Sequence, residues 1–167
     1  YAFRNELLFA EKPLEIAKEI IETTIFQISS HYLQSRSKHW DVEGFASALM
    51  VHFPVSFEQG FFADETSSSS ELEKKASEKI LSAFHQKIHH QQDLLIAFRP
   101  DLTNAEKAQS VLQEVVRNLM ARKIDQLWQE HLLHIDHLRS DVHMRTVGQK
   151  DPLLEFKHES FKLFENF

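Results

Sequence analysis

The sequence predicts an all-α protein, with a long antiparallel helical hairpin and a small, irregular helical domain. Three observations lead to this prediction. Apolar residues recur every three to four positions through most of the 167 residues, which is the spacing of one helix face. The chain has only 3 glycines and 4 prolines, so residues suited to the tight turns of a many-stranded sheet are few. Patterns of strict alternation, typical of strands, do not outweigh the helical ones.

The N-terminal part of the chain predicts two helices. Residues 3–9 have a helical pattern without a start signal, as expected at the end of a longer helix. Pro13 then opens a second helix, because a proline in the first turn lacks only an N–H that would have no helical partner there. Its apolar face is formed by Leu14, Ala17, Ile20, Ile21, Thr24, Ile25 and Ile28.

An irregular segment is expected from Gln34 to Glu65. Gly44 leads into a short apolar stretch, 45–53, which ends at Pro54. Loop phenylalanines at this density must pack against a neighbour, so we interpret them as a satellite cluster of a small helical domain. They are Phe53, Phe57, Phe61 and Phe62.

A third helix is predicted to follow the serine-rich stretch 66–70, which we interpret as a solvated linker. Ser70 and Glu73 have the spacing of a capping box, in which the serine side chain and the glutamate each bond a free amide of the first turn. The apolar periodicity continues to Phe98, and Pro100 ends the helix.

The longest periodic segment predicts the first arm of the hairpin. A second capping-box pattern, 103–106, begins it, and neither Gly nor Pro interrupts it before Gly148. About 40 residues at 1.5 Å each give a helix roughly 60 Å long. Asp151 and Pro152 supply a cap and a first-turn proline for the returning helix. The residues expected on the inner face of that helix are Leu154, Phe161 and Phe164.

Composition excludes several classes of function. With 0 cysteines, the chain can form no disulfide, no cysteine-ligated zinc site and no thiol nucleophile. A formal net charge of −6 disfavours binding to nucleic acid. The 3 separated glycines cannot form a phosphate-binding loop, so we expect no bound nucleotide cofactor. Neither a Gly-x-Ser-x-Gly nor a His-Glu-x-x-His motif is present and the carboxylates are scattered, so we expect no catalytic residues. No apolar run reaches the roughly 18 residues of a membrane span.

The 11 histidines raise the question of a metal site. His85 and His89 have the i, i+4 spacing that can chelate a transition metal, and His131 and His134 share a helix face. Because the spacing fixes no third ligand, we interpret them as ordinary histidines of amphipathic helices and predict no metal. A His-rich metal module remains as an alternative, and it predicts zinc or nickel binding that depends on His85 and His89.

The turn of the predicted hairpin combines apolar and basic residues. Met144 and Val147 stand close in sequence to Arg139, Arg145 and Lys150. This pattern fits an ordinary exposed turn, and it also fits a stiff rod that presents a small apolar and basic tip to a partner.

Four segments of the C-terminal region closely resemble the two-helix finger of the SecA family, the ATP-driven motors of bacterial preprotein translocation. They are 124–132 (IDQLWQEHL), 136–139 (DHLR), 149–152 (QKDP) and 155–161 (EFKHESF). Residues 4–8 (RNELL) are similar to the end of the family's long scaffold helix. Residues 13–100 fit the helical wing domain by position and length.

The resemblance implies three parts and a mechanical role. The parts are the end of the scaffold helix (1–12), the helical wing domain (13–102) and the two-helix finger with the helical scaffold (103–167). It implies that this fragment couples motor motion to the substrate through the finger tip and regulates the ATPase. ATP with Mg would bind nucleotide-binding domains elsewhere in the parent chain, and zinc a C-terminal tail. The fragment alone would therefore not be an enzyme.

The resemblance also implies partners and a location. The partners are the SecY channel complex, the preprotein substrate, the nucleotide-binding domains of the same parent chain and an anionic membrane surface. The location is the cytoplasm, with peripheral association at the inner membrane face. The alternative from another class is a stand-alone helical adaptor that binds a partner through residues 53–62.

Two sets of site residues follow from the resemblance. Family members often carry a bulky aromatic residue where Val147 stands, and valine keeps this position apolar. The substrate-contacting tip would comprise Met144, Arg145, Thr146, Val147 and Gly148. The residues that pack the finger on the scaffold would be Leu127, Trp128 and His131.

Overall fold

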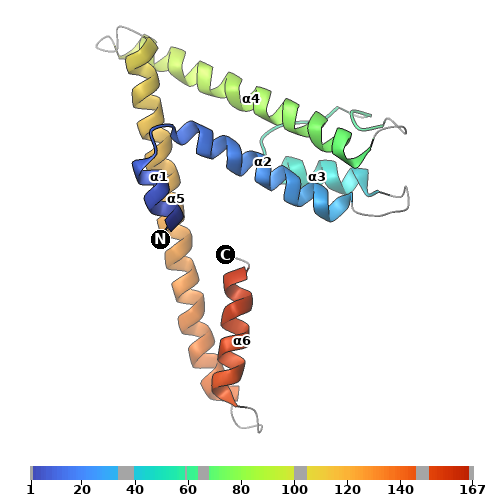
Figure 1. Ribbon diagram of the computed structural model, residues 1–167, viewed down its shortest axis with the longest axis vertical. Coiled ribbons are helices and arrows are strands. Elements are labelled where there is room, and N and C mark those ends of the chain that lie inside the picture. The colour runs from blue at the N-terminus through green and yellow to red at the C-terminus, as the bar shows by residue number, and fades with distance from the viewer. Residues whose placement is uncertain are drawn as a thin grey trace. The chain divides into compact units, whose positions relative to one another are not determined.

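The computed structural model describes residues 2–33, 40–58, 60–63, 68–99, 105–145 and 151–165. These residues form helices and no strand (Figure 1), which confirms the all-α class. The helices are α1 (Ala2–Phe9), α2 (Pro13–Tyr32), α3 (Val42–His52), α4 (Ser69–Phe98), α5 (Ala105–Arg145) and α6 (Pro152–Glu165). None of them is long and apolar enough to cross a membrane.

The chain divides into two compact units. Residues 11–115 form one, which we call the α2–α4 unit, and residues 1–10 with 116–167 form the other, the hairpin unit. Helix α5 is continuous across the change from one unit to the other. The family-based boundaries at residues 12 and 102 stay a prediction.

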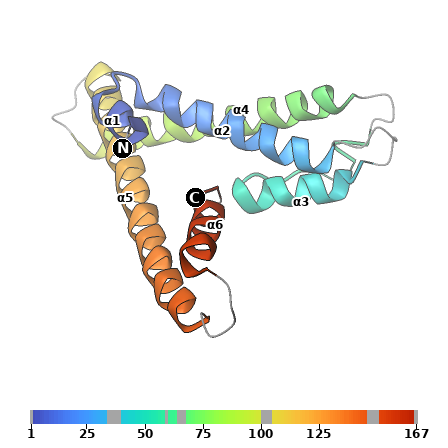
Figure 2. The same ribbon diagram turned by 60° about the horizontal axis from the view of Figure 1, so that its bottom comes forward.

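The α2–α4 unit is built on α2, which packs against both α3 and α4. Helices α2 and α4 run antiparallel, and α3 lies beside α2 (Figures 1 and 2). Their apolar faces meet in one core, as the helical periodicity predicts. The buried core residues are Ile25, Ile28, Leu33, Phe45, Leu49, Phe62, Leu72, Ala76 and Ile80.

The expectation of an irregular stretch at 45–53 was wrong, because most of it belongs to α3. The Asp41 side chain caps this helix by accepting the N–H of Gly44 at 2.8 Å. Phe45 and Leu49, four residues apart, are fully buried on its inner face. Gly44 suggests a break in the pattern, yet it lies within the first turn, where Asp41 and Tyr32 approach closely.

Helix α4 begins two residues earlier than the sequence predicts. Ser68 is the cap: its hydroxyl accepts the N–H of Glu71 at 3.2 Å, and the Glu71 carboxylate accepts the N–H of Ser68 at 2.6 Å. Both Ser68–Glu71 and Ser70–Glu73 fit the capping-box pattern, so spacing alone does not choose between them. Ser69 and Ser70 are therefore helical and not part of a linker.

The phenylalanine-rich segment packs inward, as predicted. Phe62 is buried, and its ring meets that of Phe45 edge-on at 5.4 Å. The ammonium of Lys79 on α4 lies 4.6 Å from the centre of the Phe61 ring and 5.5 Å from that of Phe57. This packing removes much of the surface that the adaptor hypothesis assigns to residues 53–62.

Candidate functional site: the hairpin unit

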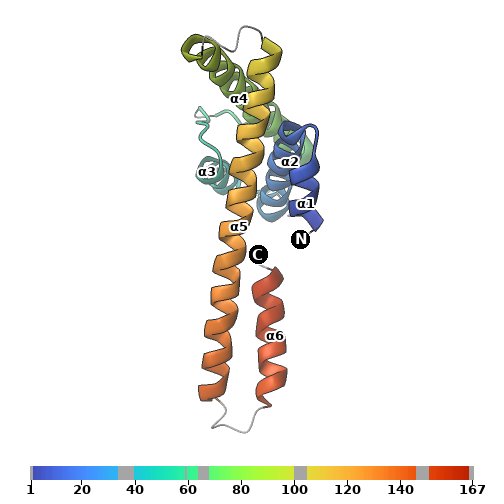
Figure 3. The same cartoon turned by 90° about the vertical axis from the view of Figure 1, so that its left-hand side faces the viewer.

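Helices α5 and α6 form the predicted antiparallel hairpin (Figure 3). Asp151 begins α6 by accepting the N–H of Leu153 at 2.9 Å, and Pro152 is its first residue. Of the predicted tip, Met144 and Arg145 belong to the last turn of α5. Thr146, Val147 and Gly148 lie outside the described residues, as does the capping box proposed at 103–106 except for its helical end.

A stripe of α5 faces the returning helix. His131, Leu138 and Val142 are buried along it, spaced by one or two helical turns. The half-buried side of α6 is formed by Glu155, Phe156, Glu159, Ser160 and Leu163. Each of these two helices therefore contributes one face to the hairpin.

The expectation that Leu154, Phe161 and Phe164 all face inward was wrong for Leu154 and Phe161, which are mostly exposed. Phe164 is also 59% exposed, but its ring meets a residue of α5. The apolar residues of α6 fall on two sides of the helix, and periodicity does not reveal which side meets α5. Charged Glu155 and Glu159 lie on the half-buried side, which hides that side from a hydrophobicity pattern.

An aromatic stack joins the two helices. The ring of His131 is stacked on Trp128, with centroids 5.6 Å apart and planes inclined by 29°. The same imidazole meets the Phe164 ring of α6 at 6.0 Å and 67°, close to edge-on. Leu127, the third residue predicted to pack, is 37% exposed. The roles of these residues in packing the finger on a scaffold stay predictions.

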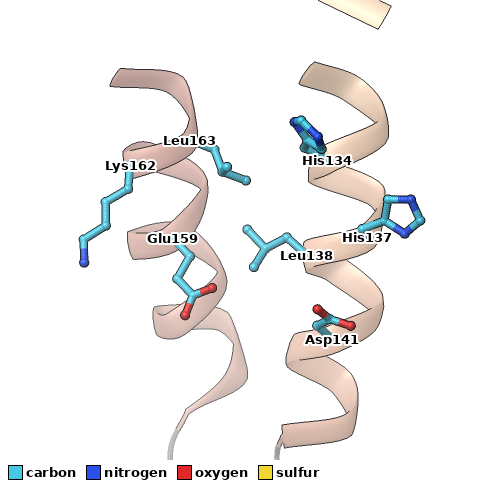
Figure 4. A pocket seen from close by; sticks show the side chains of 7 residues that line it. All are labelled: His134, His137, Leu138, Asp141, Glu159, Lys162 and Leu163. Atoms are coloured by element: carbon cyan, nitrogen blue, oxygen red, sulfur yellow. The ribbon is translucent and has the colours of Figure 1, made fainter. Parts of the chain in front are cut away.

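An open groove of about 470 Å³ runs between α5 and α6. Leu138 and Leu163 point into it from opposite helices (Figure 4).

 Histidine, carboxylate and lysine side chains share its rim: His134, His137, Asp141, Glu159 and Lys162. Among the described residues, no three His, Asp or Glu side chains lie close enough to hold a metal ion. The groove is thus a mixed polar and apolar surface.

Helix α1 is fastened to α5 at both of its ends. The Arg4 guanidinium donates two hydrogen bonds to the Asp125 carboxylate, from Nε to Oδ1 at 2.6 Å and from Nη2 to Oδ2 at 3.0 Å. Arg117 Nη2 donates to the carbonyl oxygen of Ala10 at 2.7 Å, just beyond the C-terminus of α1. Leu7, between these two contacts, is fully buried.

The Arg4–Asp125 pair has a clear electrostatic signature. The hydrogen bonds from Arg4 lower the pKa of Asp125 below the ordinary value of 3.8. Desolvation of the carboxylate opposes this shift, and the positive charge of the guanidinium adds to it. Sequence reasoning did not identify this pair. Both residues lie within the segments that resemble the SecA family, 4–8 and 124–132, but nothing in either segment alone indicates that they meet.

These features define a class of protein: a helical scaffold in which one long helix binds a short N-terminal helix and a returning helix. The particular family is shown by comparison with known proteins. The family model described as "SecA Wing and Scaffold domain" matches residues 1–167, so the chain belongs to this family.

Whole proteins of known sequence resemble this chain over most of its length. The chain is 36% identical over 167 residues to the protein translocase subunit SecA of Chlamydia pneumoniae. It is 35% identical over 169 residues to that of Chlamydia felis and 34% identical over 169 residues to that of Chlamydia trachomatis serovar L2. Each comparison covers 99% of this chain and 17% of the relative, so the chain spans about a sixth of the length of these proteins.

Proposed function

We propose that this chain is the wing-and-scaffold part of an ATP-driven protein translocase of the SecA type. The match of the whole chain to the wing-and-scaffold family supports this proposal, together with the translocase subunits that it resembles. In this proposal ATP and Mg bind other domains of the full-length protein, and zinc binds a C-terminal tail. The chain itself then supplies mechanical coupling and no catalytic residue.

The hairpin would contact the polypeptide that is being translocated. The supporting observation is the antiparallel pairing of α5 and α6, because the helix ends that flank residues 146–150 lie at the same end of the hairpin (Figure 3). A hairpin of this kind can carry a tip into the mouth of a channel. We assign the contact to Met144, Arg145, Thr146, Val147 and Gly148, with Val147 as its apolar centre.

Coupling and regulation would pass through the contact of α1 with α5. Two guanidinium groups and a buried leucine hold these helices together, so a displacement of one is transmitted to the other. Nucleotide-binding domains of the same protein would act on this pair. The other partners in this proposal are the SecY channel complex, the preprotein and an anionic membrane surface, at the cytoplasmic side of the inner membrane.

Replacing the tip valine tests this function. In the full-length protein, Val147→Asp should keep the basal ATPase rate and lose most translocation of a model preprotein, because a carboxylate disfavours contact with apolar side chains of the substrate. The matched control is Gln129→Glu, which adds one negative charge at an exposed position of α5 and should leave translocation unchanged. Normal translocation by Val147→Asp would rule out the assignment of the tip.

A further inference from the structure

Two phenylalanines of α6 have nearly equal exposure but different surroundings. Phe161 is 61% exposed and Phe164 is 59% exposed, three residues further along the same helix. The Phe164 ring meets the imidazole of His131 on α5, whereas Phe161 has no ring contact with any described residue. The two phenylalanines therefore differ in what their rings contact and not in how exposed they are.

The partner of Phe164 is itself held in a defined orientation. His131 is 8% exposed, and Trp128, one turn earlier on α5, stacks on its ring. Stacking on one face leaves the imidazole in position for an edge-on contact with a ring from the facing helix. Three aromatic side chains from two helices thus form one continuous stack.

The stack lies on the side of the groove away from the helix ends at Arg145 and Pro152. On α5 the groove residues His134, Leu138 and Asp141 follow His131, and on α6 Leu163 precedes Phe164. Between the stack and the helix ends at Arg145 and Pro152, the two helices leave an open volume of about 470 Å³. Because side chains do not fill the space between the helices along this stretch, packing there fixes the separation of the helices only weakly.

We propose that Trp128, His131 and Phe164 are positioning residues, an aromatic latch that holds α6 against α5 and so sets where the hairpin presents residues 144–148. The consequence for residues 144–148 rests on the proposed function of the tip, whereas the latch itself concerns only the separation of α5 and α6. A latch of aromatic rings requires the ring at position 164 and not merely an apolar side chain there.

Distances between spin labels on the two helices test the latch. The labels are placed at Ser140→Cys and Lys157→Cys, both exposed, in a full-length protein whose other cysteines have been replaced. Since an edge-on aromatic contact changes a population by roughly two- to twelve-fold, Phe164→Ala should increase the separated population by about that factor. Phe164→Tyr should restore the original distances, and Phe164→Leu should not. Phe161→Ala is the matched control and should leave them unchanged.

Equal distance distributions for Phe164→Ala and Phe161→Ala would overturn the latch, and so would full restoration by Phe164→Leu. Helical content, followed by circular dichroism, shows whether each variant is folded. Translocation per ATP hydrolysed is then measured on the same variants. If Phe164→Ala separates the helices but translocation is unchanged, the latch is supported and the proposed role of the tip fails.

Discussion

Single side chains decide the local structure at the start of α3. A Cβ atom at Gly44 would lie 2.2 Å from Asp41 Oδ2 and 2.8 Å from Tyr32 Cε1. The position therefore accepts only hydrogen unless the capping carboxylate and the tyrosine ring both move. The absence of a side chain here allows the cap and the ring to pack against the same turn.

Gly44→Ala is expected to destabilise the α2–α4 unit by about 1–3 kcal/mol, through the lost cap and the crowded ring. The better helix propensity of alanine, worth roughly 0.5–1 kcal/mol, offsets part of this cost. Hydrogen exchange of the α3 amides in the full-length protein measures the change. Ser47→Ala, at an exposed position of α3, is the control and should not weaken protection. Unchanged protection in Gly44→Ala would show that the neighbours relax freely.

At the same scale, the sequence predicts some site residues better than others. Trp128 and His131 lie in the apolar stripe of α5 and in the SecA-like segment, and both take part in the aromatic stack. Their partner Phe164 could not be chosen over Phe161, because both fit the periodicity of α6. The choice depends on the rotation of α6 about its own axis, which only the packing against α5 determines.

Among the helices, those with long uninterrupted periodicity could be predicted closely. Helix α5 matches the expected length of about 40 residues, with 41. Helix α3 could not be predicted, because its 11 residues contain a glycine and follow a stretch without clear periodicity. Its stability comes from tertiary burial of Phe45 and Leu49, a contribution that no local pattern records.

The contact of α1 with α5 should depend on pH. The pKa of Asp125 is lower in the folded protein than its ordinary 3.8, so the carboxylate stabilises the docked helix at higher pH. This stabilisation is lost as the pH falls below 3.8 and through the lowered pKa of the folded state. Spin labels at Glu6→Cys on α1 and Lys123→Cys on α5, in a background without other cysteines, should separate more at pH 3 than at pH 6.

The variant Asp125→Asn separates this effect from general acid denaturation. It removes the titrating group but keeps a side chain of the same shape, so the pH-dependent part of the separation should disappear. Arg4→Lys should weaken docking at both pH values, because an ammonium cannot donate the paired hydrogen bonds of a guanidinium. An identical pH dependence in Asp125→Asn would assign the change to other groups.

At the scale of the whole molecule, the order of residues along the chain does not match their grouping in space. Residues 1–10 belong with 116–167, while the first turns of α5 belong with the α2–α4 unit. Ala108 and Leu112 are buried in those first turns. Periodicity identifies α5 as one helix, but it does not show that the contacts of the helix change partway along its length.

Because the buried core from Ile25 to Ile80 lies wholly within the α2–α4 unit, the two units are expected to open separately. Phe45→Ala removes a fully buried ring from the α2–α4 unit and should cost about 3–5 kcal/mol there. Hydrogen exchange in the full-length protein should then speed up in α2, α3 and the first half of α4, and stay unchanged in α6. Leu7→Ala, in the hairpin unit, should have the reverse pattern, with faster exchange in α1 and unchanged exchange in α3. If either substitution accelerated exchange equally in both units, the two would form one cooperative structure. The α2–α4 unit and the hairpin unit would then move as a single body, and the proposed translocase could not use them independently.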